Sequence, residues 1–503
     1  MKTKILQNTL TAVNLLAALS VAVCAVVQGS TAQQTPQHHT YQLIDLGTFG
    51  GPTSYNFSEN AREMNNRGEV TGAAATTIAD PNYPNFNPIV FGGPDPFLEH
   101  AFLWSNGVLI DLGALPGANG SAAGSINNAG VAAGASTTGS IDPLTGWPAA
   151  EAVIWRNGTM IQLGTLGGQQ SVANGLNDRG QVGGMGSNTI PDPFSFFGVL
   201  FGSNGSGLTQ DRAFVWEGGV MSDIGTLGGP DAAVFDMSNA GAVGLSYTNS
   251  IPNPTTGIPT VDPFLWVNGS MTDLGTLGGT FGSPEWINNP GQVVGESDLA
   301  GDLVSHPFLW DHGVLTDLGT LGGDNGFAFF INDAGTIVGR ADLPGSTVHH
   351  GFLWKRGVMS DLGTVGSDPC SVATHINEKG QVVGKSTDCV GGVLHAFLWE
   401  NGEIVDLNSL VNPPSDAQMN IPSYINQRGE ITGTAILPNG DVHAVLLIPN
   451  GECDSSCESR ITASQASTAI TPRPKAARFS PAQRLRAMIR QRLHIAGSDP
   501  TKD

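Results

Sequence analysis

Two side chains of the kinds that enzymes use for acid–base catalysis recur along the chain in fixed contexts. An aspartate begins a DLG motif, and a histidine begins an HAF-like motif. The aspartates are Asp45, Asp111, Asp223, Asp273, Asp317, Asp361 and Asp406, and the histidines are His100, His306, His350, His395 and His443. An active site breaks the symmetry of a repeat, whereas these residues follow it. We therefore interpret both series as structural, capping turns or joining neighbouring strands.

A second set consists of aromatic residues in long segments that distinguish the first four repeats. These inserts span roughly residues 75–98, 136–149, 187–210 and 247–260. Because equivalent loops of a ring emerge on one face, the aromatic residues are predicted to form a ligand-binding rim for sugar, peptide or a partner protein. The candidates are Tyr83, Phe86, Phe91, Phe97, Trp147, Phe194, Phe196, Phe197 and Phe201. The alternative is that they pack beneath their own loops as small satellite cores.

Motifs that specify a known chemistry are missing from the sequence. There is no nucleophile elbow, HExxH zinc motif, phosphate-binding P-loop or EF-hand loop. The glycine-rich GTLGG strings recur as turns, and lone Asp-Pro pairs do not define a calcium shell. We therefore expect no catalytic residue, cofactor or metal.

Three sequence signals recur in one order and define the elements. They are a DLGTLGG segment, an INxxGxVxG hairpin, and an apolar strand that ends in Trp, as in HAFLW. Two residues follow each Trp, the second always Gly, and the pair is often Asn-Gly. Such a pair is typical of a type I′ turn. Each unit is therefore predicted to hold four short antiparallel strands.

Four strands in such a short unit are typical of a β-propeller blade. We predict an all-β fold for residues 33–450, a closed β-propeller of about eight four-stranded blades, with seven as the alternative. The body begins with a lone strand at 41–45 and ends with an unpaired one at 443–448. Pairing these leftover strands would complete the last blade and hide both edges.

The HAFLW, NG, DLGTLGG and INxxGQVVG set resembles the extracellular HAF-repeat family, over about residues 41–450. The resemblance is specific, because three motifs recur in one order. It implies export and a repeat architecture. It carries over no catalytic residue.

The two ends of the chain differ from this body. Residues 1–32 resemble a signal peptide, with Lys2 and Lys4 before an apolar stretch. Residues 451–479 are predicted to be a flexible linker, 480–494 a short basic amphipathic helix outside the ring, and 495–503 a disordered end. The helix could contact an anionic envelope surface, fold back onto the ring or remain a solvated tail.

Charge and cysteines indicate the compartment and exclude one class of partner. The formal net charge is −21, and an acidic body repels phosphate backbones, so nucleic acid is excluded as a partner. Cys370 and Cys389 flank a predicted hairpin and are expected to form a disulfide, and Cys453 and Cys457 could close a small loop. We therefore expect a secreted, periplasmic or cell-surface protein.

These observations favour an exported, non-enzymatic repeat protein that presents a binding face built by the inserts. Its partner would be a glycan, a peptide or an envelope component. The alternative is an extracellular hydrolase or lyase acting on polysaccharide or peptide, with carboxylates in the central channel or on the insert rim.

Overall fold

The computed structural model describes residues 38–451, apart from 57–60, 118, 197, 199–207, 255 and 391–393. The fold described here is that of the chain from Thr40 onward. The predicted signal peptide, the 480–494 helix and the Cys453–Cys457 pair lie outside the described residues. Among the described residues, no helix is long and apolar enough to cross a membrane.

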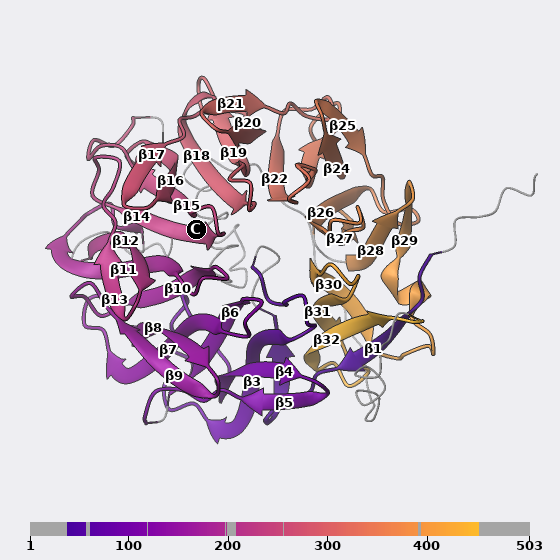
Figure 1. Ribbon diagram of the computed structural model, residues 1–503, viewed down its shortest axis with the longest axis horizontal. Helices are drawn as coiled ribbons and strands as arrows, with labels where there is room; N and C mark the ends of the chain where they lie inside the picture. Colours follow the sequence, from indigo (N-terminus) through magenta and orange to yellow (C-terminus); the bar gives the residue numbers. More distant parts are fainter. Residues whose placement is uncertain are drawn as a thin grey trace, which may run out of the picture. The chain divides into compact units, whose positions relative to one another are not determined.

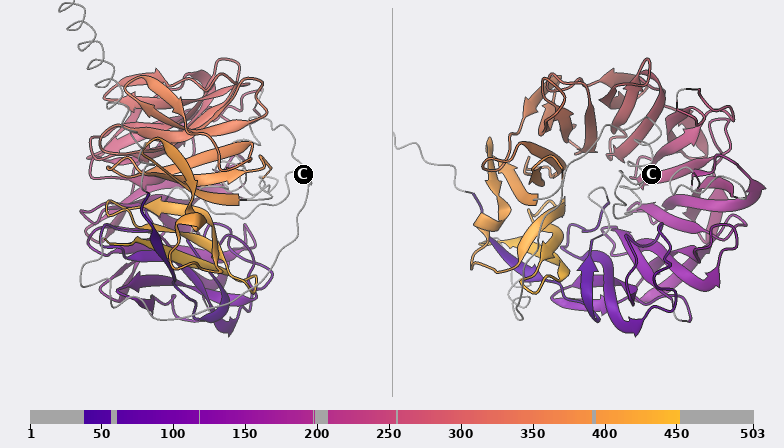
Figure 2. Two further views of the ribbon diagram at one scale, coloured as in Figure 1. Left: turned by 90° about the vertical axis from the view of Figure 1, so that its right-hand side faces the viewer. Right: turned by 180° about the vertical axis from the view of Figure 1, so that it is seen from behind.

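The described chain folds into four-stranded antiparallel sheets, which lie around a common centre as the blades of a β-propeller do (Figures 1 and 2). Within the described residues, the strands group into eight such units. Unit 1 is β2 (Gly50–Tyr55), β3 (Val70–Ala79), β4 (Phe97–Ser105) and β5 (Val108–Asp111); unit 2 is β6 (Ser121–Ile126), β7 (Ala132–Ile141), β8 (Pro148–Arg156) and β9 (Thr159–Gly164); unit 3 is β10 (Ser171–Leu176), β11 (Val182–Pro191), β12 (Thr209–Glu217) and β13 (Val220–Asp223); unit 4 is β14 (Ala232–Met237), β15 (Ala242–Tyr247), β16 (Val261–Val267) and β17 (Ser270–Asp273).

The second half of the chain continues the pattern. Unit 5 is β18 (Gly278–Ile287), β19 (Val293–Leu299), β20 (Ser305–Asp311) and β21 (Val314–Asp317); unit 6 is β22 (Gly326–Ile331), β23 (Ile337–Asp342), β24 (His349–Lys355) and β25 (Val358–Asp361); unit 7 is β26 (Cys370–Ile376), β27 (Val382–Thr387), β28 (Leu394–Glu400) and β29 (Glu403–Asp406); unit 8 is β30 (Gln418–Ile425), β31 (Ile431–Ile436), β32 (Val442–Pro449) and β1 (Tyr41–Asp45). A short 3₁₀ helix, Leu407–Leu410, joins units 7 and 8.

Unit 8 joins the two ends of the described chain in one sheet. β1 pairs antiparallel with β32, so that Tyr41 lies opposite Pro449 and Asp45 opposite Val445. This is the pairing that we predicted for the two unpaired strands at 41–45 and 443–448. In addition, β2 of unit 1 makes a parallel contact with β32 at Thr53 and Val442.

The turn after each Trp has the predicted geometry. Both central residues have positive φ, as at Asn106 (52°) and Gly107 (81°). His312 and Arg356 adopt positive φ as well, at 48° and 51°. The type I′ turn therefore imposes its backbone even where the first residue is not Asn.

Hydrogen bonds from the INxxG hairpins link each unit to the next. The Asn65 side chain donates to the Asn127 carbonyl at 3.1 Å, and the pattern continues through Asn127, Asn177, Ser238, Asn288, Asn332 and Asn377. Asn426 of unit 8 then donates to the Asn65 carbonyl of unit 1 at 3.2 Å. We call these eight residues the asparagine belt. In unit 4, whose hairpin is one residue shorter than the others, the Ser238 hydroxyl makes the equivalent hydrogen bond to the Asn288 carbonyl.

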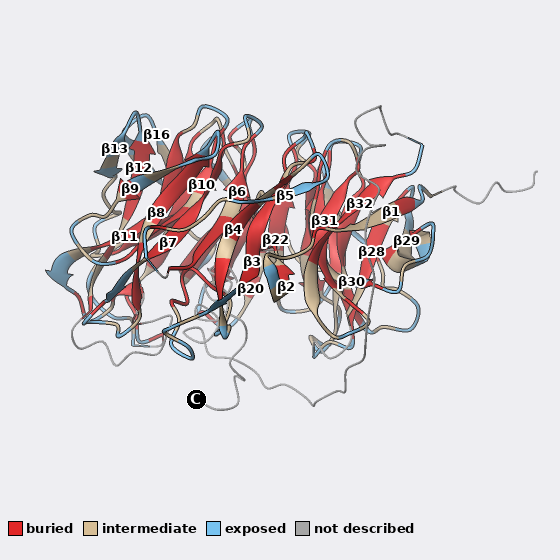
Figure 3. Ribbon diagram, turned by 90° about the horizontal axis from the view of Figure 1, so that it is seen from below, coloured by how far each residue is buried: buried red, intermediate tan, exposed pale blue. Residues whose placement is uncertain are grey.

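In six units the core is built around a phenylalanine on the third strand, and units 2 and 8 place Val153 and Val445 there. Phe102, Phe214 and Phe352 are fully buried, and the residue opposite each is a glycine of the INxxGxVxG motif. A Cβ added at Gly72 would collide with the Tyr55 carbonyl oxygen and lie 2.7 Å from the Phe102 ring, which explains the last glycine of the motif. Buried residues follow the inner strands of the units, and exposed ones gather on the fourth strands, such as β5 and β13, and at the turns (Figure 3).

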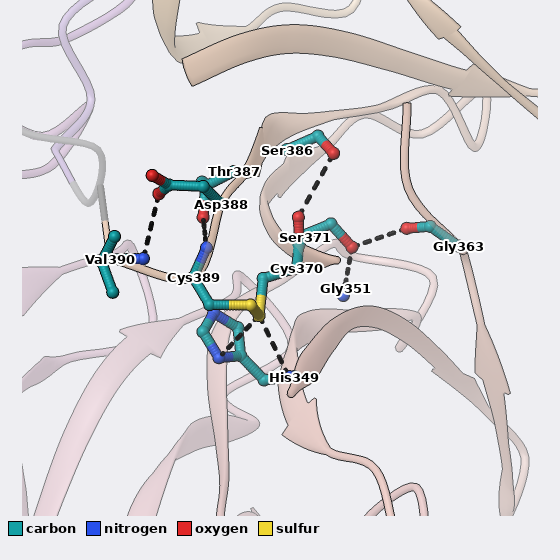
Figure 4. Close-up of a disulfide and its surroundings, with 10 residues drawn as sticks. All are labelled: His349, Gly351, Gly363, Cys370, Ser371, Ser386, Thr387, Asp388, Cys389 and Val390. Atoms are coloured by element: carbon teal, nitrogen blue, oxygen red, sulfur yellow. Dashed lines mark hydrogen bonds between the residues drawn. A yellow bond between two sulfur atoms is a disulfide. The ribbon is translucent and has the colours of Figure 1, made fainter. Parts of the chain in front are cut away.

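The expected Cys370–Cys389 disulfide is present, with the two Cα atoms 5.1 Å apart. Cys370 pairs in the ladder with Thr387, so Cys389 lies just beyond the end of the strand. The Cys370 sulfur lies 3.6 Å from Nδ1 of His349 in the preceding unit (Figure 4). A disulfide of this kind indicates an oxidising compartment.

Candidate functional site

The recurring histidines and aspartates stabilise the units, as predicted. His100 Nδ1 lies 3.0 Å from a carboxylate oxygen of Asp111, and Asp111 accepts the Gly113 backbone N–H at 2.7 Å. The imidazole thus ties the third strand to the fourth, and the carboxylate caps the following turn. The same pairs occur at His306 and Asp317, His350 and Asp361, and His443 and Asp45.

The structure separates the predicted rim aromatics into buried and exposed members. Phe196 is 1% exposed and Phe91 is 9% exposed, both in one hydrophobic cluster with residues of inserts and strands. Phe86 and Phe194 pack against the same cluster. Tyr83 is 52% exposed, Phe97 and Trp147 are half-buried, and Phe197 and Phe201 lie outside the described residues.

Three of these residues, Phe86, Phe91 and Phe97, line a cavity of about 20 Å³ together with Asp95 and Glu99. The Tyr55 hydroxyl donates to Glu99 at 2.9 Å, and burial raises the pKa of Glu99 to about 8. A buried acid of this kind suits proton transfer. The cavity has room for about one water molecule, and so it does not admit a substrate.

A larger site lies at the inner strands, where sequence reasoning did not place one. In units 2–8 the second residue before the hairpin asparagine, or before its serine equivalent, follows a β-bulge, as between Ala373 and His375. Bulges re-aim the side chain that follows them. This axial position carries Glu63, Ser125, Gly175 and Asp236 in units 1–4, and Trp286, Phe330, His375 and Tyr424 in units 5–8.

Ring contacts bring the aromatic axial residues together. Trp286, Phe330, His375 and Tyr424 contact one another in sequence, with ring centroids 4.4, 4.7 and 4.9 Å apart. Trp286 also meets His375 at 5.8 Å, and Phe330 meets Tyr424 at 6.4 Å. Contacts that skip a unit require these side chains to converge near the centre of the propeller.

Arg62 of unit 1 extends the cluster from the other side. Its guanidinium lies 5.6 Å from the ring centroid of Trp286, in unit 5. This is a cation–π geometry. Arg62 therefore reaches from unit 1, whose axial residue is polar, to the aromatic axial residues of units 5–8.

Above this cluster is a cavity of about 190 Å³, which we call the axial pocket. Arg62, Trp286, Phe330 and Tyr424 form its floor. Its mouth consists of the residue that follows each belt asparagine in seven of the units: Asn66, Asn128, Asp178, Asn289, Asp333, Glu378 and Gln427. Aligning the repeats at this position and at the axial position would have revealed both sets.

Hydrogen bonds between neighbouring units hold the mouth residues in place. Asp333 accepts the backbone and side-chain N–H groups of Asn289, both at 2.9 Å. Glu378 accepts the backbone N–H of Asp333 at 2.7 Å. Gln427 donates its backbone N–H to Asn66 at 3.2 Å. Asp178 likewise accepts the backbone N–H of Asn128 at 2.9 Å. The three carboxylates are therefore fixed by donors and keep further lone pairs for a ligand.

The charges of the floor are set by burial and by the surrounding acids. Burial alone would lower the pKa of Arg62, but Tyr424 and nearby carboxylates, Asp236 first among them, raise it overall. Burial raises the pKa of the Tyr424 hydroxyl, so it stays protonated. Burial, aided by Arg62, lowers the pKa of His375 to about 3, which keeps its ring neutral. The pocket thus has a guanidinium cation and a neutral phenol at its floor and carboxylates at its mouth.

Comparison with known proteins gives structural likeness alone. No known protein family matches the chain, and no curated protein matches it. Similar solved structures include an oligogalacturonate lyase in complex with manganese, with 10% identity, a TM-score of 0.40, and coverage of 82% of this chain and 97% of that one. The β-propeller domain of the Trilobed protease from Pyrococcus furiosus has 9% identity, a TM-score of 0.39, and coverage of 65% and 96%.

A Pyrococcus horikoshii acylaminoacyl peptidase gives 10% identity and a TM-score of 0.38, over 64% of this chain and 49% of that one. The chain spans about half the length of that peptidase. These neighbours are peptidases and a lyase, a correction to the expectation of a non-enzymatic protein. Likeness at this level establishes no activity or substrate for this chain.

Proposed function

We propose that the protein is an exported hydrolase or lyase that degrades glycan at the axial pocket. The observation that carries the proposal is that the axial position holds one kind of residue in half of the units and another kind in the other half. Four consecutive units supply aromatic or imidazole rings there, and the units that remain supply acids and small residues. A repeat that served only the fold would not divide in this way.

The composition of the pocket fits a sugar. Tyr424, which is only half-buried, offers its ring to the apolar side of a pyranose, and Trp286 packs behind it as part of the buried cluster. The amides and carboxylates of the mouth match a ring of hydroxyls, since both kinds of group accept hydrogen bonds in fixed directions.

The same residues supply the groups that glycosidic cleavage needs. Asp178, Asp333 and Glu378 are carboxylates suited to act as base or nucleophile toward a bound sugar. The protonated Tyr424 hydroxyl can donate a hydrogen bond to the sugar on the floor, and the leaving oxygen takes its proton from one of the mouth carboxyl groups. Arg62 would stabilise negative charge that develops near the floor.

The architecture that we propose for this enzyme is a closed propeller of eight blades. The asparagine belt supports it, because the bond from Asn426 returns to Asn65. We further propose secretion, or location in the periplasm or at the cell surface, and membership of the HAF-repeat family. The disulfide supports export, and the repeated motifs support the family.

The proposal is tested by incubating residues 33–503 with end-labelled neutral, amino-sugar and uronate oligosaccharides and separating the products. We expect shortened products from at least one class, accompanied by ultraviolet absorbance if an elimination leaves an unsaturated sugar. Intact oligosaccharides in every class, or cleavage of peptides in place of glycans, would contradict it.

A further inference from the structure

The axial pocket is small for a polymer-degrading site. Its volume of about 190 Å³ is below the roughly 300–1,000 Å³ of pockets that enclose drug-sized ligands. A space of this size accommodates about one sugar ring. A stretch of polysaccharide several residues long does not fit inside it.

The floor of the pocket is filled with side chains. The ring pairs Trp286–His375 and Phe330–Tyr424 each skip a unit, and Arg62 lies over Trp286 from unit 1. Trp286 is 2% exposed and His375 is 1% exposed. These side chains fill the floor of the pocket on the side of units 5–8, where a chain entering at the mouth meets buried rings.

The mouth does not open sideways either. Glu378 accepts backbone N–H groups from Asp333 and Ala334 of the neighbouring unit, and it donates its own N–H to Gln427. Such bonds, together with the belt beneath them, tie consecutive hairpins together. Parting two hairpins to admit the middle of a chain would break several of these hydrogen bonds at once.

From this geometry, and resting on the proposed function, we infer that the enzyme is exo-acting: its substrate is the free end of a glycan chain. The terminal residue enters the axial pocket end-on and stacks on the floor. The glycosidic bond to the next residue then lies at the level of the mouth carboxylates. Cleavage releases one small product per event and shortens the polymer from one end.

The test compares a linear oligosaccharide that the enzyme degrades with a cyclic oligosaccharide of the same sugar and linkage, which has no ends. We expect the linear substrate to lose one residue at a time in a mass spectrum. We expect the cyclic one to react at least about 100-fold more slowly, a difference of about 2.7 kcal/mol in activation free energy.

Comparable cleavage of the cyclic substrate, or early products of mixed length from the linear one, would overturn the exo inference while the proposed function stood. If no linear oligosaccharide of any class were degraded, the proposed function would fail, and this inference with it.

Discussion

His443 Nδ1 lies 2.8 Å from a carboxylate oxygen of Asp45, and the pair joins the last long strand of the described chain to the first. The two residues are 398 positions apart. In other units the equivalent pair lies within one hairpin, as His100 and Asp111 do. Here alone among the described pairs, the bond holds the N-terminal strand in place.

Replacing His443 with Ala is therefore expected to loosen the sheet that contains both ends. The pair is largely buried, with side-chain exposures of 13% and 15%, and hydrogen bonds to charged groups contribute about 1.5–3 kcal/mol. We expect a fall of that order in the free energy of unfolding, measured by urea denaturation. His312→Ala, at a turn and 73% exposed, is the control and should change little. Equal effects of the two substitutions would contradict this role.

Unit 4 places an aspartate, Asp262, where five of the units place histidine. Burial raises its pKa to about 6, and the adjacent Asp273 adds to the shift. A carboxyl whose folded pKa is raised favours folding below its unfolded pKa of roughly 4, and this contribution is lost as pH rises through about 6.

Asp262→Asn removes this titration. We expect the variant to melt at a higher temperature than the wild type at pH 7 and at the same temperature at pH 4. Asp361→Asn, which removes a partner of His350, should lower the melting temperature at pH 7. A variant at Asp262 that was less stable than the wild type at pH 7 would contradict a destabilising charge at this position.

Glu99 gives a second pH dependence, on the alkaline side. Its pKa of about 8 results from burial, with Asp95 and Asp80 adding to the shift. As for Asp262, the folded-state pKa is raised, so the stability that Glu99 contributes at low pH is lost as pH rises through about 8. Thermal melts of the wild type should drop between pH 7 and pH 9, and Glu99→Gln should reduce the drop. An unchanged drop in the variant would assign the effect to another group.

The disulfide is expected to stabilise unit 7. It closes a loop of 19 residues, for which chain entropy predicts about 3 kcal/mol. The Cys370→Ala, Cys389→Ala double variant should unfold at lower denaturant, and its midpoint should not respond to reductant. The wild-type midpoint should fall to that of the variant on reduction. A midpoint equal to that of the oxidised wild type would refute a stabilising role.

Local signals in the sequence predicted the repeated unit, because turns depend on a few neighbouring residues. Asn106-Gly107 and the INxxG hairpins define where strands reverse, and each lies where predicted. The link from Asn426 to Asn65 was not predictable in the same way. It is made between distant segments and exists only once the units are assembled.

The site was harder to predict than the fold, for two physical reasons. Aromatic composition does not distinguish a side chain beneath a loop from one on its surface, and so Phe196 and Tyr83 looked equivalent in the inserts. The axial residues, in turn, read as ordinary strand positions, because the bulge that re-aims His375 is a backbone feature without a sequence signature here.

The central claim is that glycan is cleaved at the mouth of the axial pocket. The most direct test compares kcat/KM of Glu378→Gln with that of Glu217→Gln, the same substitution at the exposed end of β12. Glu217→Gln should melt close to the wild type, whereas Glu378→Gln keeps one acceptor and loses the other, for the Ala334 N–H, so turnover is compared at a temperature at which both variants are folded. We predict a loss of about 100-fold or more for Glu378→Gln, as expected when an acid–base group is removed, and wild-type turnover for Glu217→Gln. Wild-type turnover in both variants would contradict the assignment of Glu378 to the reaction.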